Sequence, residues 1–269
     1  MDAQQARQLD PWFWSHYDNA AGIVVSLVPP GSLQGGRFVV DFGCGDGATA
    51  LGFATKAQAT VIGVDLFRSF DRLPDLARSN LGAQFLPPNL SFRQNTIGAP
   101  LPLADGCIDL AYSWSVFEHL ADVRGVLSEL RRILKPQGAL FIQIEPLFHS
   151  PYGSHLRRLV DEPWAHLLRS EEEYLALAAG TQDNVPRDEQ DVLYRNNAFE
   201  DVKRHLIDEY RKLNRISATG LLHELATAGF SVEWKKLLTT ELAPPPALLE
   251  RFPRELLVTD QVVVLATRH

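Results

Sequence analysis

The segment VVDFGCGDG, residues 39–47, joins an apolar run to three glycines at alternate positions. The apolar run predicts a short strand over Phe38–Phe42, and the residues after the glycines predict a helix over Ala48–Ala57. Glycine lets the backbone turn sharply and approach a ligand closely. In a doubly wound sheet such a loop lies at the ligand crevice, where N–H groups of the following helix face it. The segment therefore predicts an α/β domain that binds a nucleoside-like ligand.

The rest of the sequence continues this alternation of strands and helices. Further strands are predicted over Val61–Val64, Leu90–Arg93, Ile108–Ser113, Ala139–Ile144, Phe230–Leu238 and Gln261–Thr267, and helices over Val123–Leu134 and Ala218–Ala228. Strands that alternate with helices indicate a mostly parallel sheet with both faces covered.

Composition narrows the class of function. Lys and Arg total 26 against 33 Asp and Glu, so the net charge of the 269 residues is −7. That balance gives no general attraction to phosphate backbones or anionic lipid, so we expect neither a nucleic-acid nor a membrane partner.

No stretch approaches about 18 apolar residues, and no basic and apolar leader opens the sequence, which favours a cytoplasmic location. Cys44 and Cys107 are the only cysteines, so we expect no disulfide framework and no metal site.

An acid precedes the glycine run. Asp41 followed by G-x-G-x-G differs from the dinucleotide fingerprint G-x-G-x-x-G. It resembles motif I of class I S-adenosylmethionine-dependent methyltransferases. Asp65, eighteen residues beyond Gly47 and at the end of the second predicted strand, fits an acid that accepts both ribose hydroxyls.

Further segments extend the resemblance to the small-molecule branch of that family. They are LPLADGCIDL at 101–110, SVFEHL at 115–120, LRRILKPQG at 130–138 and LHELATAGF at 222–230. The run HSPYGSH at 149–155, followed by PWAH at 163–166, also shows a faint likeness to methyltransferases linked to bacterial glycan assembly. We therefore expect an α/β fold: a Rossmann-like, doubly wound sheet of about seven strands, the last one antiparallel, with a helical insertion.

The expected domain organisation follows from where the likeness stops. Residues 1–35 are expected to form an N-terminal helical segment, and residues 36–146 with 216–269 the S-adenosylmethionine-binding domain. Residues 147–215 contain no convincing strand and are expected to form an inserted helical substrate cap. The connection 239–259, rich in Pro and Leu, is expected to cross the surface.

The resemblance implies S-adenosyl-L-methionine as cofactor and a set of residues that hold it. Asp41, Gly43 and Gly45 would contact its methionyl part, and Asp65 with Leu66 its ribose and adenine. The acid often found near the adenine amino group has no clear counterpart, so Asn95 or Thr96 is expected to substitute. The full expected set is Asp41, Gly43, Cys44, Gly45, Asp65, Leu66, Asn95, Thr96, Ser113 and Phe117.

Two features leave alternatives open. Ser113 and Phe117 follow the fourth strand and are expected to face the transferred methyl group, but an aromatic residue there also suits the core. Gln137 replaces the first glycine of the family's PGG turn, which is tolerable if this position does not need a positive φ.

A methyl acceptor with a hydroxyl must also lose its proton. His155 and, after it, His149 are the candidate bases, since both follow the fifth strand and histidine titrates near neutral pH. Glu118 and His119 are a second acid and base pair, although in relatives this pair more often starts the next helix. We expect O-methylation of a small molecule, such as a sugar or natural-product hydroxyl. The alternative is a non-catalytic S-adenosylmethionine-binding or assembly protein, and the sequence leaves the acceptor and the oligomeric state open, a homodimer included.

Overall fold

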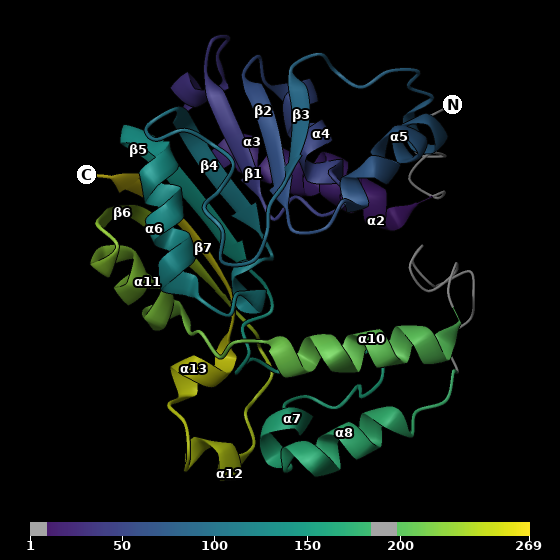
Figure 1. The fold of residues 1–269 in the computed structure, drawn as a ribbon. Coiled ribbons are helices and arrows are strands. Elements are labelled where there is room, and N and C mark those ends of the chain that lie inside the picture. Colours follow the sequence, from purple (N-terminus) through teal and green to yellow (C-terminus); the bar gives the residue numbers. More distant parts are fainter. Residues whose placement is uncertain (1–9, 184–197) are drawn as a thin grey trace.

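Seven strands form a single sheet in the computed structural model, which describes residues 10–183 and 198–269 (Figure 1). The strand order is β3-β2-β1-β4-β5-β7-β6. The strands are β1 Phe38–Phe42, β2 Thr60–Asp65, β3 Leu90–Gln94, β4 Ile108–Trp114, β5 Leu134–Ile144, β6 Phe230–Thr239 and β7 Thr259–Arg268. β7 runs antiparallel to β5 and β6, and the remaining pairs are parallel. This confirms the predicted Rossmann-like sheet with its reversed last strand.

Helices cover both faces of the sheet. They are α2 Pro11–Trp14, η1 Ser15–Ala20, α3 Ala21–Leu27, η2 Pro30–Leu33, α4 Ala48–Lys56, η3 Ser69–Arg72, α5 Leu73–Leu81, η4 Phe117–His119, α6 Val123–Ile133 and α11 Ala218–Thr227. Successive side chains of a strand point to opposite faces. Accordingly Val40 packs in the core under α6 and α11, whereas Val39 packs in the core under α3 and α4.

Among the described N-terminal residues, α2, η1 and α3 pack on α4. Phe13 is fully buried against Ala48 and Leu51 of that helix. The carbonyl oxygen of Tyr17 approaches Gly52 so closely that a Cβ on this glycine would lie 1.9 Å from it. The segment therefore covers the helix that follows the glycine loop.

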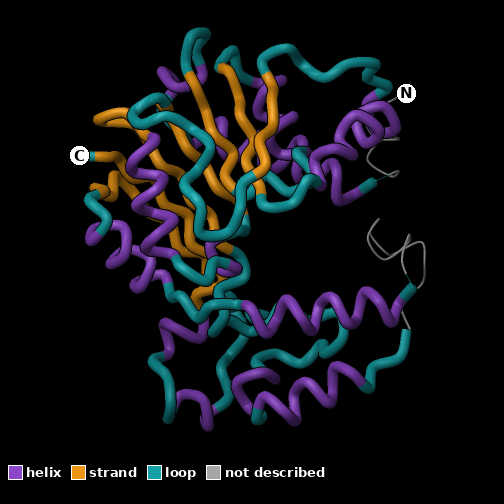
Figure 2. The backbone as a smooth tube through the Cα atoms, viewed as in Figure 1, coloured by secondary structure: helices purple, strands orange, loops and turns teal. Residues whose placement is uncertain are grey.

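The insertion contributes helices and no strand among its described residues. These helices are α7 Ala165–Leu168, α8 Glu171–Ala179 and α10 Phe199–Lys212. Figure 2 shows them below the sheet, on the side where the loop after β5 leaves it. They have a hydrophobic core of their own, which includes Trp164, Tyr174 and Tyr210.

The connection between β6 and β7 runs over the surface, as predicted, and also forms two short helices. It contains α12 Pro246–Leu249 and α13 Arg254–Val258, whose Leu248 and Leu257 are buried in the core of the insertion. The Trp164 indole N–H donates to the Leu257 carbonyl at 3.2 Å. Two segments far apart in sequence thus build this second layer, because each presents an apolar face that the other covers.

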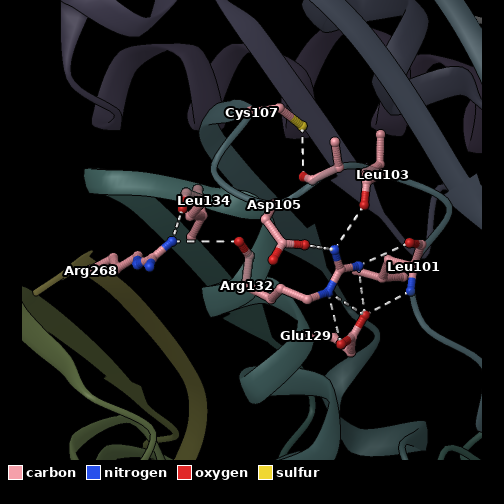
Figure 3. Close-up of polar contacts among 9 residues, drawn as sticks. Leu101, Leu103, Asp105, Cys107, Glu129, Arg132, Leu134 and Arg268 are labelled. Carbon is pink, nitrogen blue, oxygen red and sulfur yellow. Dashed lines mark hydrogen bonds and ion pairs between the residues drawn. The ribbon is translucent and has the colours of Figure 1, made fainter.

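The motif at 101–110 has a structural role at the opposite edge of the sheet (Figure 3). The Arg132 guanidinium donates to the carbonyls of Leu101 and Leu103 at 3.0 and 2.9 Å. It also pairs with Asp105 and Glu129. A hollow of about 390 Å³ adjoins this network, at the ends of the strands away from the glycine loop, so it lies outside the cofactor site.

Gln137 is tolerable in its turn only if the position does not need a positive φ, and the structure contradicts this condition. Gln137 has φ +63°, in the left-handed region where a side chain is strained. Strand β5 also begins at Leu134, before this turn, because Leu134 pairs with Ile108.

Within the described residues, no helix is long and apolar enough to cross a membrane.

Candidate active site

The glycine loop after β1 is a tight turn fixed by backbone bonds. The N–H groups of Gly43 and Cys44 both donate to the Val64 carbonyl at the end of β2, at 2.8 and 3.2 Å. Gly43 has φ +77°, and a Cβ on it would lie 2.4 Å from the Val116 side chain. Gly45 has φ +54° and nothing within 4 Å of its would-be Cβ. The loop therefore needs glycine for its turn and leaves open space at Gly45.

Asp65 is held in position by the same loop. Its Oδ2 accepts the Gly45 N–H at 2.8 Å, and its Oδ1 accepts the Phe67 N–H at 2.9 Å. Each carboxylate oxygen can accept a further hydrogen bond. The carboxylate is thus ready to accept two neighbouring hydroxyls.

An apolar surface lies beside Asp65. Leu66 and Phe67 follow β2 and are exposed, Phe67 to 70%, and Ile97 beyond β3 is 80% exposed. The Asn95 N–H donates to the Asp65 carbonyl at 2.8 Å, which joins the two loops, and Thr96 is exposed next to it. The structure therefore brings together, at one edge, the residues predicted to hold ribose and adenine.

Asp41 is a buried acid with an unsatisfied oxygen. It is 2% exposed, and among the described residues its Oδ2 has no hydrogen-bond partner. Burial raises the pKa of Asp41 to about 8, against the lowering effect of the neighbouring Tyr112 hydroxyl. Burying a carboxyl in this way is costly, so a ligand donor is the natural partner for the free oxygen.

These residues fit S-adenosylmethionine. Asp41 offers an unpaired acceptor for the ammonium group of the cofactor, and Gly45 leaves room for its methionyl part. Asp65 offers acceptors for the two ribose hydroxyls. Cys44 lies in the same loop, but burial raises the pKa of its thiol, so it is a neutral packing group. Within the described residues, no three metal-binding side chains form a cluster.

Two members of the expected cofactor set have closed environments. The Ser113 hydroxyl is buried and donates to the Phe42 carbonyl at 3.0 Å, which ties β4 to β1. The Phe117 ring is fully buried in the core and packs edge-on against Phe42 at 6.3 Å between ring centres. The Ser113 hydroxyl is thus already used within the sheet, and Phe117 takes the core alternative that the sequence left open.

The two candidate histidine bases lie in different places. His155 Nε2 faces the Pro146 carbonyl at 3.3 Å, and its ring lies 5.3 Å from that of His119. His149 instead lines a hollow of about 230 Å³ together with Ser217 and Leu237. Burial lowers the pKa of His155 to about 4 and also lowers the pKa of His149. Both are therefore weaker bases than a free histidine.

The turn after β4 is clamped by a residue that sequence reasoning did not find. The Asn214 side-chain amide donates to the carbonyls of Phe117 and Leu120 at 2.6 and 2.9 Å, and its backbone N–H donates to the Glu118 carbonyl at 2.9 Å. Asn214 lies just beyond α10. The contact spans nearly a hundred residues and follows no local pattern, so no sequence signal could have indicated it.

Comparison with known proteins agrees with this geometry. Residues 40–142 match the family model described as a methyltransferase domain. A trans-aconitate 2-methyltransferase from Azoarcus sp. (strain BH72) is 35% identical over 147 residues, which cover 54% of this chain and 52% of that protein. An O-methyltransferase from Pyrenophora dematioidea is 32% identical over 107 residues, which cover 40% of this chain and 39% of that protein. The chain thus spans about half or less of the length of these curated relatives.

A solved structure shows the shared fold. The crystal structure of geranyl diphosphate C-methyltransferase from Streptomyces coelicolor A3(2), in complex with Mg²⁺, geranyl diphosphate and S-adenosyl-L-homocysteine, superposes with a TM-score of 0.54. It is 16% identical and covers 93% of this chain and 77% of its own. Together with the matching family model and the fit of the cofactor loops, these likenesses show that the chain carries a class I S-adenosylmethionine-dependent methyltransferase domain, whose cofactor is S-adenosylmethionine.

Proposed function

We propose that this chain transfers the methyl group of S-adenosylmethionine to an oxygen atom of a small molecule. The observation that carries the proposal is the pairing of a free buried acceptor on Asp41 with the positioned Asp65 carboxylate at one edge of the sheet. When bound, the cofactor supplies an electrophilic methyl group on its sulfonium. The chain's residues have to hold the cofactor, align the acceptor behind the methyl group and take up a proton from a hydroxyl.

The helical layer supports a small-molecule acceptor. Residues 147–215 leave the sheet at the end of β5 and return by Asn214, which is bonded to the turn after β4. We assign this insertion as the substrate cap, with α12 and α13 packed into it. A cap that excludes water favours a compact acceptor over a polymer, and the net negative charge disfavours nucleic acid. The name of the Pyrenophora relative, an O-methyltransferase, favours oxygen as the acceptor atom.

The test measures release of S-adenosylhomocysteine. The protein is incubated with S-adenosylmethionine and a panel of catechol, 4-hydroxybenzoate, glucose and trans-aconitate, with ethanolamine as a nitrogen acceptor. Methylation of an oxygen in any of them supports the proposal, and methylation of the ethanolamine nitrogen alone contradicts the choice of oxygen. Tight cofactor binding without release of S-adenosylhomocysteine would instead favour a non-catalytic binding protein.

A further inference from the structure

Glu118 is a buried carboxyl that the fold does not explain. The side chain is 2% exposed, and neither carboxyl oxygen has a hydrogen-bond partner in the part of the chain that the structure describes. Glutamate is rarely buried without a partner, since an unsatisfied buried polar group destabilises the fold. A carboxyl buried in this way indicates that its partner arrives with a ligand.

The position of Glu118 is beside the reaction centre implied by the cofactor loops. It lies on η4, at the end of β4 from which parallel strands present residues to the ligand crevice. Two residues earlier, Val116 packs against Gly43 of the glycine loop. The charge of Glu145, at the end of the neighbouring strand β5, acts on Glu118. The turn that carries Glu118 therefore adjoins the cofactor loop and the strand that leads into the insertion.

The turn is rigid enough to aim a side chain. Asn214 binds the carbonyls of Phe117, Glu118 and Leu120, as described above. Its own side-chain oxygen accepts the Ile216 N–H at 3.0 Å. The clamp connects the acid to the end of the insertion, so the cap and the acid are positioned together.

The charged and titratable groups around the turn include one cation, which is paired elsewhere. They are Glu145 after β5, His119 on the same turn, His155 in the loop after Pro146, and Glu209 on α10, whose carboxylate lies 3.9 Å from the His119 ring. The cation is Lys212 of α10, which pairs with Glu209 at 2.9 Å. Among the described residues, no lysine or arginine pairs with Glu118. Burial, with the charge of Glu145 added, raises the pKa of Glu118 to about 8, against the lowering effect of its own backbone N–H. A base with a pKa near the working pH transfers protons most effectively, whereas burial lowers the pKa of both candidate histidines, that of His155 to about 4.

We propose that Glu118, rather than His155 or His149, takes the proton of the acceptor hydroxyl, an inference that rests on the proposed O-methylation. The acceptor oxygen forms a bond to the methyl carbon as the bond from that carbon to sulfur breaks. The hydroxyl proton passes to a Glu118 carboxylate oxygen. The products are the methyl ether, neutral S-adenosylhomocysteine and protonated Glu118, which returns its proton to water after release.

The kinetic test compares Glu118→Gln with His155→Ala, His149→Ala and the surface control Glu200→Gln. Turnover of the best hydroxyl probe from the panel is measured between pH 5.5 and 9.5. We expect Glu118→Gln to lower kcat by at least about 100-fold and to abolish the rise of rate with pH. The dissociation constant for S-adenosylmethionine should stay within about twofold of wild type, because Glu118 is not assigned to the cofactor. A rise of rate that survives in Glu118→Gln and disappears in either histidine variant overturns the inference and leaves O-methylation intact.

A second measurement needs only binding of a hydroxyl probe and no turnover. Infrared difference spectra between wild type and Glu118→Gln, taken across pH in the complex with S-adenosylhomocysteine, isolate the carboxyl band of this side chain. We expect a protonated carboxyl band that persists well above pH 5 and shifts when catechol is added. A band that is absent above pH 5, or that catechol leaves unchanged, overturns the assignment. Loss of S-adenosylhomocysteine binding by the wild-type protein would instead contradict the cofactor site and the proposed function.

Discussion

The substitution Asp41→Asn tests two effects of the Asp41 carboxyl separately. One is its cost to the stability of the fold, and the other is its contribution to cofactor binding. The carboxyl of Asp41 is buried and its pKa is raised from 3.8 to about 8. An acid whose pKa is higher in the folded state binds its proton more tightly there. The stability that this proton contributes is fully present below about pH 4 and is lost as the pH rises to about 8. Asparagine carries no charge, so the variant should not show this loss.

The magnitude follows from the size of the shift. About four pKa units correspond to on the order of 5 kcal/mol at pH 8, at 1.36 kcal/mol per unit. The asparagine amide still lacks a partner in the buried site, which costs about 1–3 kcal/mol. We therefore expect a net gain of about 2–4 kcal/mol at pH 8 without cofactor. That gain raises Tm by about 4–16 °C, and the difference should shrink toward pH 5.

Cofactor binding should change in the opposite direction. Loss of a charged acceptor for the ammonium group costs about 1.5–3 kcal/mol, which weakens binding of S-adenosylmethionine roughly 10- to 150-fold. Wild-type protein should also release a proton on binding near pH 7, because the ligand's positive charge favours the carboxylate. Calorimetry in buffers of different ionisation enthalpy counts that proton, and Asp41→Asn should release less.

The matched control is Asp46→Asn on the same loop. Asp46 is less buried, and its Oδ1 already accepts the Ala48 N–H at 3.0 Å. This variant should show neither the gain in Tm at pH 8 nor the large loss of affinity. A lower Tm for Asp41→Asn at pH 8, or unchanged affinity and proton release, would refute the reasoning that Asp41 is a strained acid whose partner is the cofactor.

Three other substitutions test neighbouring parts of the argument. Asp65→Ala should weaken S-adenosylmethionine binding roughly 10- to 150-fold in calorimetry, while Asp71→Ala on the exposed surface should not; equal effects would place the ribose elsewhere. Arg132→Met should lower the free energy of unfolding in urea by about 2–3 kcal/mol and leave cofactor affinity unchanged, since two loop carbonyls lose their donor at the far edge. Asn214→Ala should lower the free energy of unfolding in urea by about 2–3 kcal/mol, because the turn after β4 loses its clamp. A loss under about 0.5 kcal/mol would mean that the turn is stable without Asn214.

The fold was predictable where the signal is local. Strands β1 and β2 are mostly apolar runs with a turn signal after them, and both match the predicted runs to within a residue at each end. The start of β5 was missed because Pro136 and Gln137 indicate a turn, yet Leu134 still pairs with Ile108 across an irregular register. Gln137 accepts a left-handed backbone there, a conformation that its residue type does not favour.

In the candidate site, too, the residues fixed by local sequence were predictable, and those fixed by contacts between distant segments were not. The cofactor loops follow directly from one short motif and the acid at the end of the next strand, and the structure places Asp41, Gly45 and Asp65 at one edge. The acceptor side depends on how the insertion folds back, which is set by contacts between distant segments. Sequence order put His149 and His155 close together, but only His155 lies beside the turn after β4.

Asp41 and Glu118 are two buried acids with unpaired oxygens at the same edge of the sheet. Their burial affects the stability of the protein, and the proposed mechanism uses both. Asp41 and Glu118 are both about 2% exposed, and both have pKa values raised to about 8 by burial. Each destabilises the fold as the pH rises, and neither side chain improves packing enough to offset that cost. The surrounding structure tolerates them because rigid elements fix their positions: Asp41 lies within a paired strand, and the turn that carries Glu118 is clamped by Asn214. Asp41 lies in β1 before the glycine loop and Glu118 on the turn after β4, so the proposed mechanism assigns the first acid to the cofactor and the second to the acceptor.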